Sequence, residues 1–373
     1  MSKSIVLKLL CLVMLIDNCL NMYKTSPPKN LRNINKIYDS SFTIANDKPV
    51  ITGNNVFFIG RGDVLQGFNY NKLSLFNSAS IFYPYGENSF IKPLNFFSTI
   101  IDFRSLFFTK DCSLRAYIDD GKDTCKYLQL QLDFRELKDD YCYDTLRVYY
   151  DPLTSFTAVY NIRNKKIIVF DLDETYSKKK RKIILEASME GNIKKAMIYT
   201  RGQKKESVLI GIDGYGTINF WNLKGYKNIF SSVWNHVFHK DLIKSFNTEC
   251  CLPYSDQDFA TFINGDKLLF INGDNFYLYD VNKIKYIRTQ YNLIKGVSSL
   301  LGLKDGNALV GTESGYMYLI SLNNGLIEIL DKEKICENKI VFLSSIENCT
   351  EGTTYCYTIA VNCGKLKILE IKS

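Results

Sequence analysis

The sequence predicts an all-β protein, a single β-propeller of about seven four-stranded blades. Three observations support this fold class. A pair of short apolar strands joined by a Gly-, Asn- or Asp-containing turn recurs seven times. The polar residues that end the second strand of each pair are spaced 50, 52, 51, 58, 41 and 49 residues apart, a period that fits a four-stranded blade. An unpaired strand-like segment near the N-terminus is available to close the ring.

The seven strand pairs follow one another with little chain left over. They are Val56–Ile59 with Val64–Tyr70, Leu106–Thr109 with Ser113–Asp119, Phe156–Tyr160 with Lys166–Asp171, Val208–Ile212 with Thr217–Leu223, Leu268–Ile271 with Phe276–Val281, Ala308–Gly311 with Tyr316–Leu322, and Tyr355–Val361 with Lys365–Ile371. The polar residues that end the second strands are Asn69, Asp119, Asp171, Asn222, Asp280, Ser321 and Glu370. The common register indicates one repeated structural unit.

Most pairs are flanked by further strand-like segments that would complete a blade. Expected first strands are Thr99–Phe103, Leu146–Tyr150, Ala196–Tyr199 and Ile340–Leu343, and expected fourth strands are Tyr127–Leu132, Lys182–Leu185, Ile284–Arg288 and Leu326–Leu330. The last pair has no fourth strand because the chain stops at Ser373. We expect Ile34–Tyr38 to supply it, which closes the ring and removes its open edges.

One stretch departs from the strand pattern. Between residues 231 and 247, apolar residues recur at helical spacing: Trp234, Val237, Phe238, Leu242, Ile243 and Phe246. This spacing predicts one short helical insertion near 231–247, which would also account for the 58-residue interval.

The ends of three second strands carry a recognisable dipeptide. Phe170-Asp171, Trp221-Asn222 and Tyr279-Asp280 resemble the aromatic-acidic pair that ends the third strand of WD-repeat blades. The chain departs from that family in its longer repeats and in lacking the Gly-His dipeptide of each blade, with only two His in total. Quinoprotein-type and sialidase-type propellers are neighbouring families. The resemblance implies a rigid platform that binds protein partners.

The N-terminus has the pattern of a secretory leader. Lys3 precedes an apolar run from Ile5 to Ile16, interrupted only by Lys8, and polar residues follow. The run is too short to span a bilayer comfortably. We therefore expect a signal peptide at residues 1–21, a linker at 22–32 and the propeller at 33–373, with no membrane span after cleavage. The predicted localisation is the secretory pathway, either secreted or at the cell surface.

Cysteine usage fits export to an oxidising compartment. Beyond Cys11 and Cys19 in the leader, nine cysteines remain. Disulfide candidates flank one hairpin or crowd the last blade: Cys112, Cys125, Cys336, Cys349, Cys356 and Cys363. Their pairing is left open, because connectivity does not follow from sequence. The vicinal pair Cys250-Cys251 does not have zinc-site spacing, so we expect no metal and no cofactor.

A competing interpretation comes from Ile167–Thr175, which resembles the first motif of haloacid-dehalogenase-like phosphatases. That resemblance implies a Mg²⁺-dependent phosphatase with Asp171 as nucleophile and Asp173 as acid and base, and Thr200 at a second motif. The propeller register places Asp171 at a blade end instead. A phosphatase core also requires alternating helices that the period-two pattern does not provide.

Charge and short motifs add little specificity. The net charge of +8 is dispersed except for one basic run, Lys178, Lys179, Lys180, Arg181 and Lys182. A solvated loop explains this run, and a glycan-binding patch is the alternative. Asn348 begins a glycosylation sequon, and Arg61-Gly62-Asp63 is an integrin-like tripeptide in a turn.

These observations favour a non-enzymatic scaffold for protein–protein interaction or adhesion, with protein partners in an extracellular complex. A preformed ring presents loops at small ordering cost, which suits binding. The alternatives are the phosphatase and a glycan-binding propeller. Nucleic acid is not an expected partner, because the basic run has no interleaved aromatic residues.

Overall fold

The computed structural model describes residues 31, 34–43, 50–52, 55–59, 65–69, 72–77, 91–92, 104–109, 113–118, 126–134, 137, 145–151, 153–172, 174–175, 183–201, 206–223, 242–247, 259–303, 306–347 and 356–372. Within these residues, the strands form seven four-stranded sheets. Every strand pairing in them is antiparallel.

Each sheet is one blade, numbered here in chain order. Blade 1 holds β2 (Val50–Thr52), β3 (Asn55–Ile59), β4 (Leu65–Asn69) and β5 (Ser74–Asn77). Blade 2 holds β6 (Ile91–Lys92), β7 (Arg104–Thr109), β8 (Ser113–Ile118) and β9 (Lys126–Asp133). Blade 3 holds β10 (Leu146–Tyr150), β11 (Phe156–Asn161), β12 (Lys166–Asp171) and β13 (Ile183–Ser188).

The next three blades repeat this order. Blade 4 holds β14 (Ile193–Arg201), β15 (Glu206–Asp213), β16 (Thr217–Leu223) and β17 (Leu242–Asn247). Blade 5 holds β18 (Ala260–Ile263), β19 (Lys267–Asn272), β20 (Asn275–Asp280) and β21 (Lys285–Gln290). Blade 6 holds β22 (Val297–Gly302), β23 (Ala308–Thr312), β24 (Tyr316–Asn323) and β25 (Leu326–Lys334).

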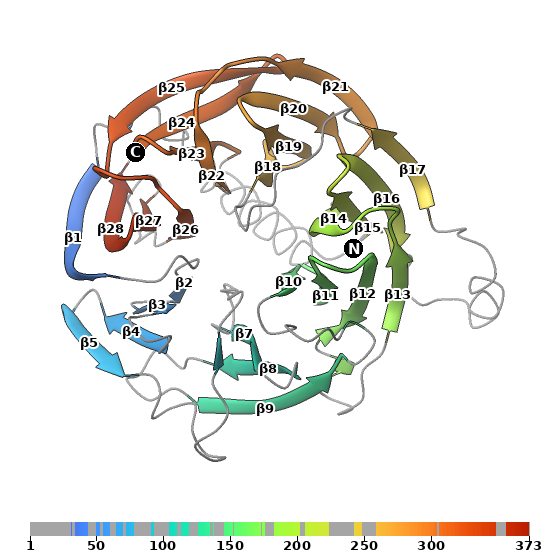
Figure 1. Cartoon of the computed structure of the whole chain (residues 1–373), viewed down its shortest axis with the longest axis horizontal. Coiled ribbons are helices and arrows are strands. Elements are labelled where there is room, and N and C mark those ends of the chain that lie inside the picture. Colours follow the sequence, from blue (N-terminus) through green and yellow to red (C-terminus); the bar gives the residue numbers. More distant parts are fainter. Residues whose placement is uncertain are drawn as a thin grey trace, which may run out of the picture.

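Blade 7 joins the two ends of the chain. It consists of β26 (Phe342–Glu347), β27 (Cys356–Asn362), β28 (Lys365–Lys372) and, as its outermost strand, the N-terminal β1 (Ile34–Thr43). β1 pairs with β28 in a register that sets Ile34 opposite Ile371. Figure 1 shows the blades as a ring with first strands toward the centre and fourth strands outside. The predicted propeller and its closure by an N-terminal strand are confirmed.

Most of the core in the described part of the chain lies between neighbouring blades. Central strands are buried on both faces, because each sheet packs against its neighbours; β15 and β23 show near-continuous burial. Trp221 and Leu209 of blade 4 pack with Ile167 of blade 3. Phe220 of blade 4 clusters with Phe270 of blade 5 through its other face. Fourth strands such as β25 are largely exposed and carry charged residues that protect the outer edge.

Two sequence expectations need correction. Leu242, Ile243 and Phe246 lie on strand β17, which pairs with β16, so the predicted helix near 231–247 is wrong over residues 242–247; residues 231–241 lie outside the described part. The blade requires a fourth strand here, and pairing with β16 overrides the helical spacing. The first strand of blade 2 lies at Ile91–Lys92, upstream of the predicted 99–103, which is outside the described residues.

Candidate functional site

One end of the ring carries a series of polar contacts between blades. Strands alternate in direction, so the turn after each first strand and the turn after each third strand lie at the same end of a blade. In blades 3 to 5 this end holds Asp151, Tyr199, Thr200, Asp266 and Asn282. We call this end the network face.

Three of the turns after third strands are fixed by polar residues that the repeat register singled out. In these three turns the side-chain oxygen accepts a hydrogen bond from the backbone N–H three residues later. The bonds are Asn69 Oδ1 with Lys72 N (2.9 Å), Asp171 Oδ1 with Glu174 N (2.9 Å) and Asp280 Oδ1 with Lys283 N (2.8 Å). These three polar residues are therefore turn caps.

The Asp171 carboxylate accepts hydrogen bonds from two other residues, Ser155 before β11 and Glu174 after β12. Besides the Glu174 amide, its Oδ1 accepts a hydrogen bond from Ser155 Oγ at 2.7 Å. Its strand belongs to an antiparallel blade, so the parallel α/β core that the phosphatase resemblance implies is absent from the described part of the chain. The phosphatase interpretation is wrong on fold. Asp173 lies outside the described residues.

A buried polar cluster joins blade 3 to blade 4. Thr200 Oγ1 donates to Asp151 Oδ2 and lies 2.9 Å from Ser207 Oγ. Leu153 N donates to Asp151 Oδ1 at 3.3 Å, and the Leu153 side chain is 68% exposed. Burial, with a smaller effect of the Asp151 charge, raises the pKa of the Tyr149 phenol. The cluster fixes the innermost strands relative to each other and leaves one apolar side chain on the surface.

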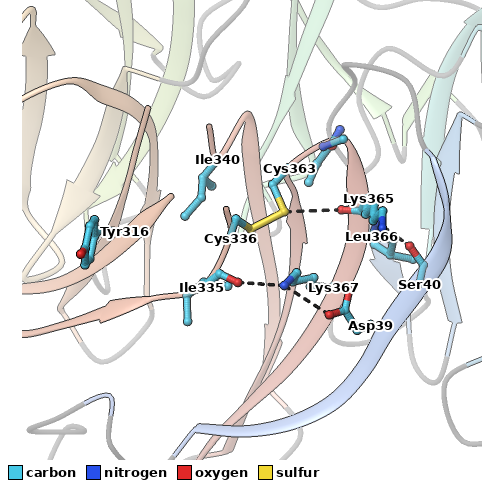
Figure 2. Close-up of a disulfide and its surroundings, with 12 residues drawn as sticks. Asp39, Ser40, Tyr316, Ile335, Cys336, Ile340, Cys363, Lys365, Leu366 and Lys367 are labelled. Carbon is cyan, nitrogen blue, oxygen red and sulfur yellow. Dashed lines mark hydrogen bonds and ion pairs between the residues drawn. A yellow bond between two sulfur atoms is a disulfide. The ribbon is translucent and has the colours of Figure 1, made fainter. Parts of the chain in front are cut away.

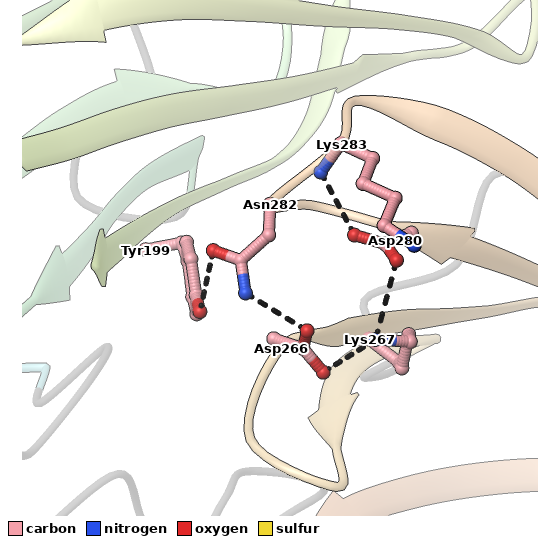
Figure 3. Close-up of polar contacts among 6 residues, drawn as sticks. All are labelled: Tyr199, Asp266, Lys267, Asp280, Asn282 and Lys283. Carbon is pink, nitrogen blue, oxygen red and sulfur yellow. Dashed lines mark hydrogen bonds and ion pairs between the residues drawn. The ribbon is translucent and has the colours of Figure 1, made fainter. Parts of the chain in front are cut away.

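A second network joins blade 4 to blade 5 (Figure 3). Tyr199 Oη donates to Asn282 Oδ1 at 3.2 Å, and Asn282 Nδ2 donates to Asp266 Oδ2 at 2.8 Å. Lys267 Nζ lies 2.6 Å from Asp266 Oδ1 and 3.4 Å from Asp280 Oδ2. The network thus links an inner strand of one blade to both turns of the next blade on this face.

The charges of this network favour one another. Burial opposes ionisation of Asp280, but the Lys283 amide and the Lys267 ammonium outweigh it and hold the pKa of the carboxyl below its ordinary value. Burial likewise disfavours the charged form of Lys267, and the hydrogen bond and charge of Asp266, followed by Asp280, outweigh it and raise the pKa of the amine. The Lys267 ammonium is therefore held between two carboxylates, those of Asp266 and Asp280.

The carboxylates of the network face have their partners within the protein. Across the described residues, no group of three or more His, Cys, Asp or Glu side chains is placed to hold a metal ion. The Asp151 and Asp266 carboxylates accept hydrogen bonds from Thr200 and Asn282, which fixes the turns that carry them. No helix in the described part of the chain has the length and apolar character needed to cross a membrane.

Of the sequence-predicted site residues, the structure joins one pair. Cys336 and Cys363 form a disulfide with a Cα–Cα distance of 6.4 Å. Cys356 lies on β27, where its side chain is not described. The remaining candidates lie outside the described residues: Cys112, Cys125, Cys349, Asn348, Arg61-Gly62-Asp63 and the basic run Lys178, Lys179, Lys180, Arg181 and Lys182.

The inter-blade networks are the feature that sequence reasoning missed. Tyr199 and Asn282 are 83 residues apart, and no local pattern pairs them. The available signal was positional, because Asp266 and Asn282 both occupy turns of the same predicted repeat. Once the blade register is known, turns on one end of neighbouring blades become candidate partners.

Comparisons with known proteins identify the fold alone. No protein-family model matches the chain, and no curated protein matches its sequence. Solved structures do match. A chain of the mitotic checkpoint complex superposes with a TM-score of 0.59 at 7% identity, covering 94% of this chain and 93% of that one.

Two further structures give the same result. The WD40 domain of Neurospora crassa Pan2 matches with a TM-score of 0.55 at 10% identity, over 92% of this chain and 96% of that chain. Raptor of Chaetomium thermophilum matches with a TM-score of 0.59 at 11% identity over 91% of this chain, which spans only 29% of Raptor. The chain has a WD40-like β-propeller fold.

Proposed function

We propose that this chain, a WD40-like propeller, is a non-enzymatic protein-interaction scaffold of the secretory pathway. Propellers of this fold commonly serve as protein-interaction scaffolds. The observation that carries the proposal is the network face, where turns of successive blades are fixed by side-chain hydrogen bonds before any partner binds. A preformed surface loses little conformational entropy on binding.

Two features support the localisation. The apolar run at residues 5–16 follows a lysine, as in secretory leaders. The Cys336–Cys363 disulfide fits an oxidising compartment, where such bonds persist. Mass spectrometry of the mature N-terminus tests this part. Cleavage near residue 21 is expected, whereas a full-length chain with reduced cysteines in the cytosol would overturn it.

Partner binding is tested by affinity capture of the tagged, secreted chain and two surface variants. Leu153 is 68% exposed on the network face, and Tyr215 is 61% exposed on the hairpin at the opposite end of blade 4. Leu153→Arg is expected to weaken capture of the same partner proteins by at least tenfold, because a charge replaces exposed apolar surface. Tyr215→Arg is the matched control and should leave capture unchanged.

Other outcomes would contradict the proposal in different places. Loss of capture with Tyr215→Arg but not with Leu153→Arg would move the interface to the opposite face. The absence of any reproducible partner from the native secretory compartment would overturn the scaffold function itself. Binding to a glycan array that is lost when Lys178–Lys182 are neutralised would instead support the glycan-binding alternative.

A further inference from the structure

The disulfide lies at the point where the ring closes (Figure 2). Cys336 lies in the connection that follows β25 and leads into blade 7, and Cys363 lies in the hairpin between β27 and β28. The bond therefore joins the connection between blades 6 and 7 to the β27–β28 hairpin, whose strand β28 pairs with β1. Both residues are buried, at 2% and 8% exposure.

A single ammonium joins the disulfide-bearing segment to the N-terminal strand. Lys367 Nζ donates to the backbone oxygen of Ile335 at 2.9 Å, and Ile335 directly precedes Cys336. The same ammonium lies 3.3 Å from Asp39 Oδ2 on β1. Figure 2 shows Lys367 between these two partners. The Lys367 side chain thus contacts both the connection that carries Cys336 and strand β1.

A buried hydroxyl provides a second link. The pairing of β1 with β28 is irregular between Asp39 and Thr43, so the regular ladder is interrupted there. Ser40 Oγ accepts the hydrogen bond of Leu366 N at 2.9 Å in this interval, and Ser40 is buried. Leu366 is three residues from Cys363, on the hairpin that the disulfide holds.

We propose that the disulfide and strand β1 form a latch, in which oxidation of Cys336 and Cys363 and docking of β1 stabilise each other. When the bond forms, the two thiols lose two electrons and two protons, and a disulfide-bonded oxidant is reduced to two thiols. Both cysteines are largely buried in the closed ring, so we expect an attacking thiolate to reach the disulfide faster when β1 and blade 7 open. Coupling of this kind is reciprocal.

The first test measures how fast dithiothreitol reduces the disulfide in the folded full chain, by mass spectrometry after thiol alkylation. Ser40→Ala removes the acceptor of a buried N–H, and we expect reduction to accelerate about tenfold. Asp39→Asn removes the charge beside Lys367, and a smaller acceleration of about threefold is expected. Asp266→Asn is the control, because it removes a comparable ion pair from blade 5. Equal rates in all four proteins would overturn the latch.

The reciprocal test follows hydrogen exchange of β1. Reduction of the disulfide, or the double change Cys336→Ser and Cys363→Ser, should raise exchange at residues 34–43 about tenfold and leave β15 of blade 4 unchanged. If the double variant does not fold, the reduction rates of the Ser40 and Asp39 variants decide the question alone. Unchanged exchange of β1 after complete reduction would overturn the proposal. Neither measurement depends on a partner, so the latch and the scaffold function stand or fall separately.

Discussion

Asp280 shows how one side chain serves both a turn and a charge network. Its Oδ1 accepts the Lys283 amide, and its Oδ2 faces the Lys267 ammonium. The carboxyl is partly buried, which alone would favour the neutral form. Since the two interactions prevail, the pKa of Asp280 lies below its ordinary value, and the folded state prefers the ionised form more than the unfolded chain does.

The predicted consequence is a pH dependence of stability. A lowered folded pKa contributes stability that is present above the unfolded pKa of about 3.9 and is lost as pH falls through the folded pKa. Asp280→Asn keeps an oxygen for the turn and loses the charge, so we expect a loss of about 1 kcal/mol at pH 7 and a shallower decline below about pH 4. Urea unfolding at a series of pH values measures both. Parallel pH profiles for the two proteins would contradict this assignment.

Gly315 occupies a position that only glycine fits. Its φ is +81°, and a Cβ added there would meet the Cys336 backbone oxygen at 1.9 Å. Its own carbonyl accepts hydrogen bonds from Ile335 and Cys336, so the contact cannot relax without breaking them. Gly273 also has positive φ, +59°, but no atom lies within 4 Å of an added Cβ.

These two glycines form a matched pair for mutation. Gly315→Ala combines backbone strain with a steric clash, and we expect it to lower the free energy of unfolding by more than about 3 kcal/mol. Gly273→Ala carries the strain alone, with an expected cost of about 1 kcal/mol. Chemical denaturation of both variants checks the difference. Similar costs would mean that the connection at Cys336 yields more readily than its hydrogen bonds indicate.

At the scale of single elements, the sequence predicted the second and third strands of every blade and was less successful at the blade margins. Those central strands are continuous apolar runs ending at turn residues, and both faces are buried. Outer strands are partly exposed to solvent, and some contain bulges. In β17 the bulge lies between Leu242, which is opposite Trp221, and Lys244, which is opposite Phe220. A bulge shifts side-chain alternation by one residue, so Leu242, Ile243 and Phe246 matched helical spacing while lying on a strand.

Strand β17 makes a prediction that a helix would not. On the predicted helix, Ile243 and Phe246 would share a buried face. On the strand, Ile243 is 47% exposed. The Phe246 ring packs edge-on against two aromatic rings, with centroid distances of 5.8 Å to Phe220 and 5.5 Å to Tyr279. We therefore expect Phe246→Ala to cost about 2–3 kcal/mol and Ile243→Ala less than about 1 kcal/mol. Equal destabilisation in thermal unfolding would favour the helical arrangement.

At the scale of the whole molecule, ring closure was predictable and inter-blade contact was not. The last blade lacked a strand, and Ile34–Tyr38 had no partner of its own, so one missing element identified the other. The contacts on the network face required the ring geometry, because they join blades through side chains far apart in sequence. The disulfide pairing was open because several cysteines lie in or near the last blade, and connectivity among them does not follow from sequence. The two cysteines are 27 residues apart, and in the loop-entropy model a disulfide at this separation stabilises the folded state by about 3.5 kcal/mol.

Ring closure by β1 is tested by two truncations of the chain. Removal of residues 1–43 deletes β1, so the outer backbone edge of β28 has no partner strand. This strand is rich in apolar residues, including the buried Leu369 and Ile371. Removal of residues 1–30 keeps β1 and serves as the control. We expect the shorter chain to melt at least about 5 °C below the control and to associate as concentration rises, because the exposed edge recruits a strand from another copy. Scanning calorimetry and light scattering measure the two effects. If both truncated chains melt together and stay monomeric, the blade is stable with three strands and closure by β1 is not needed for stability.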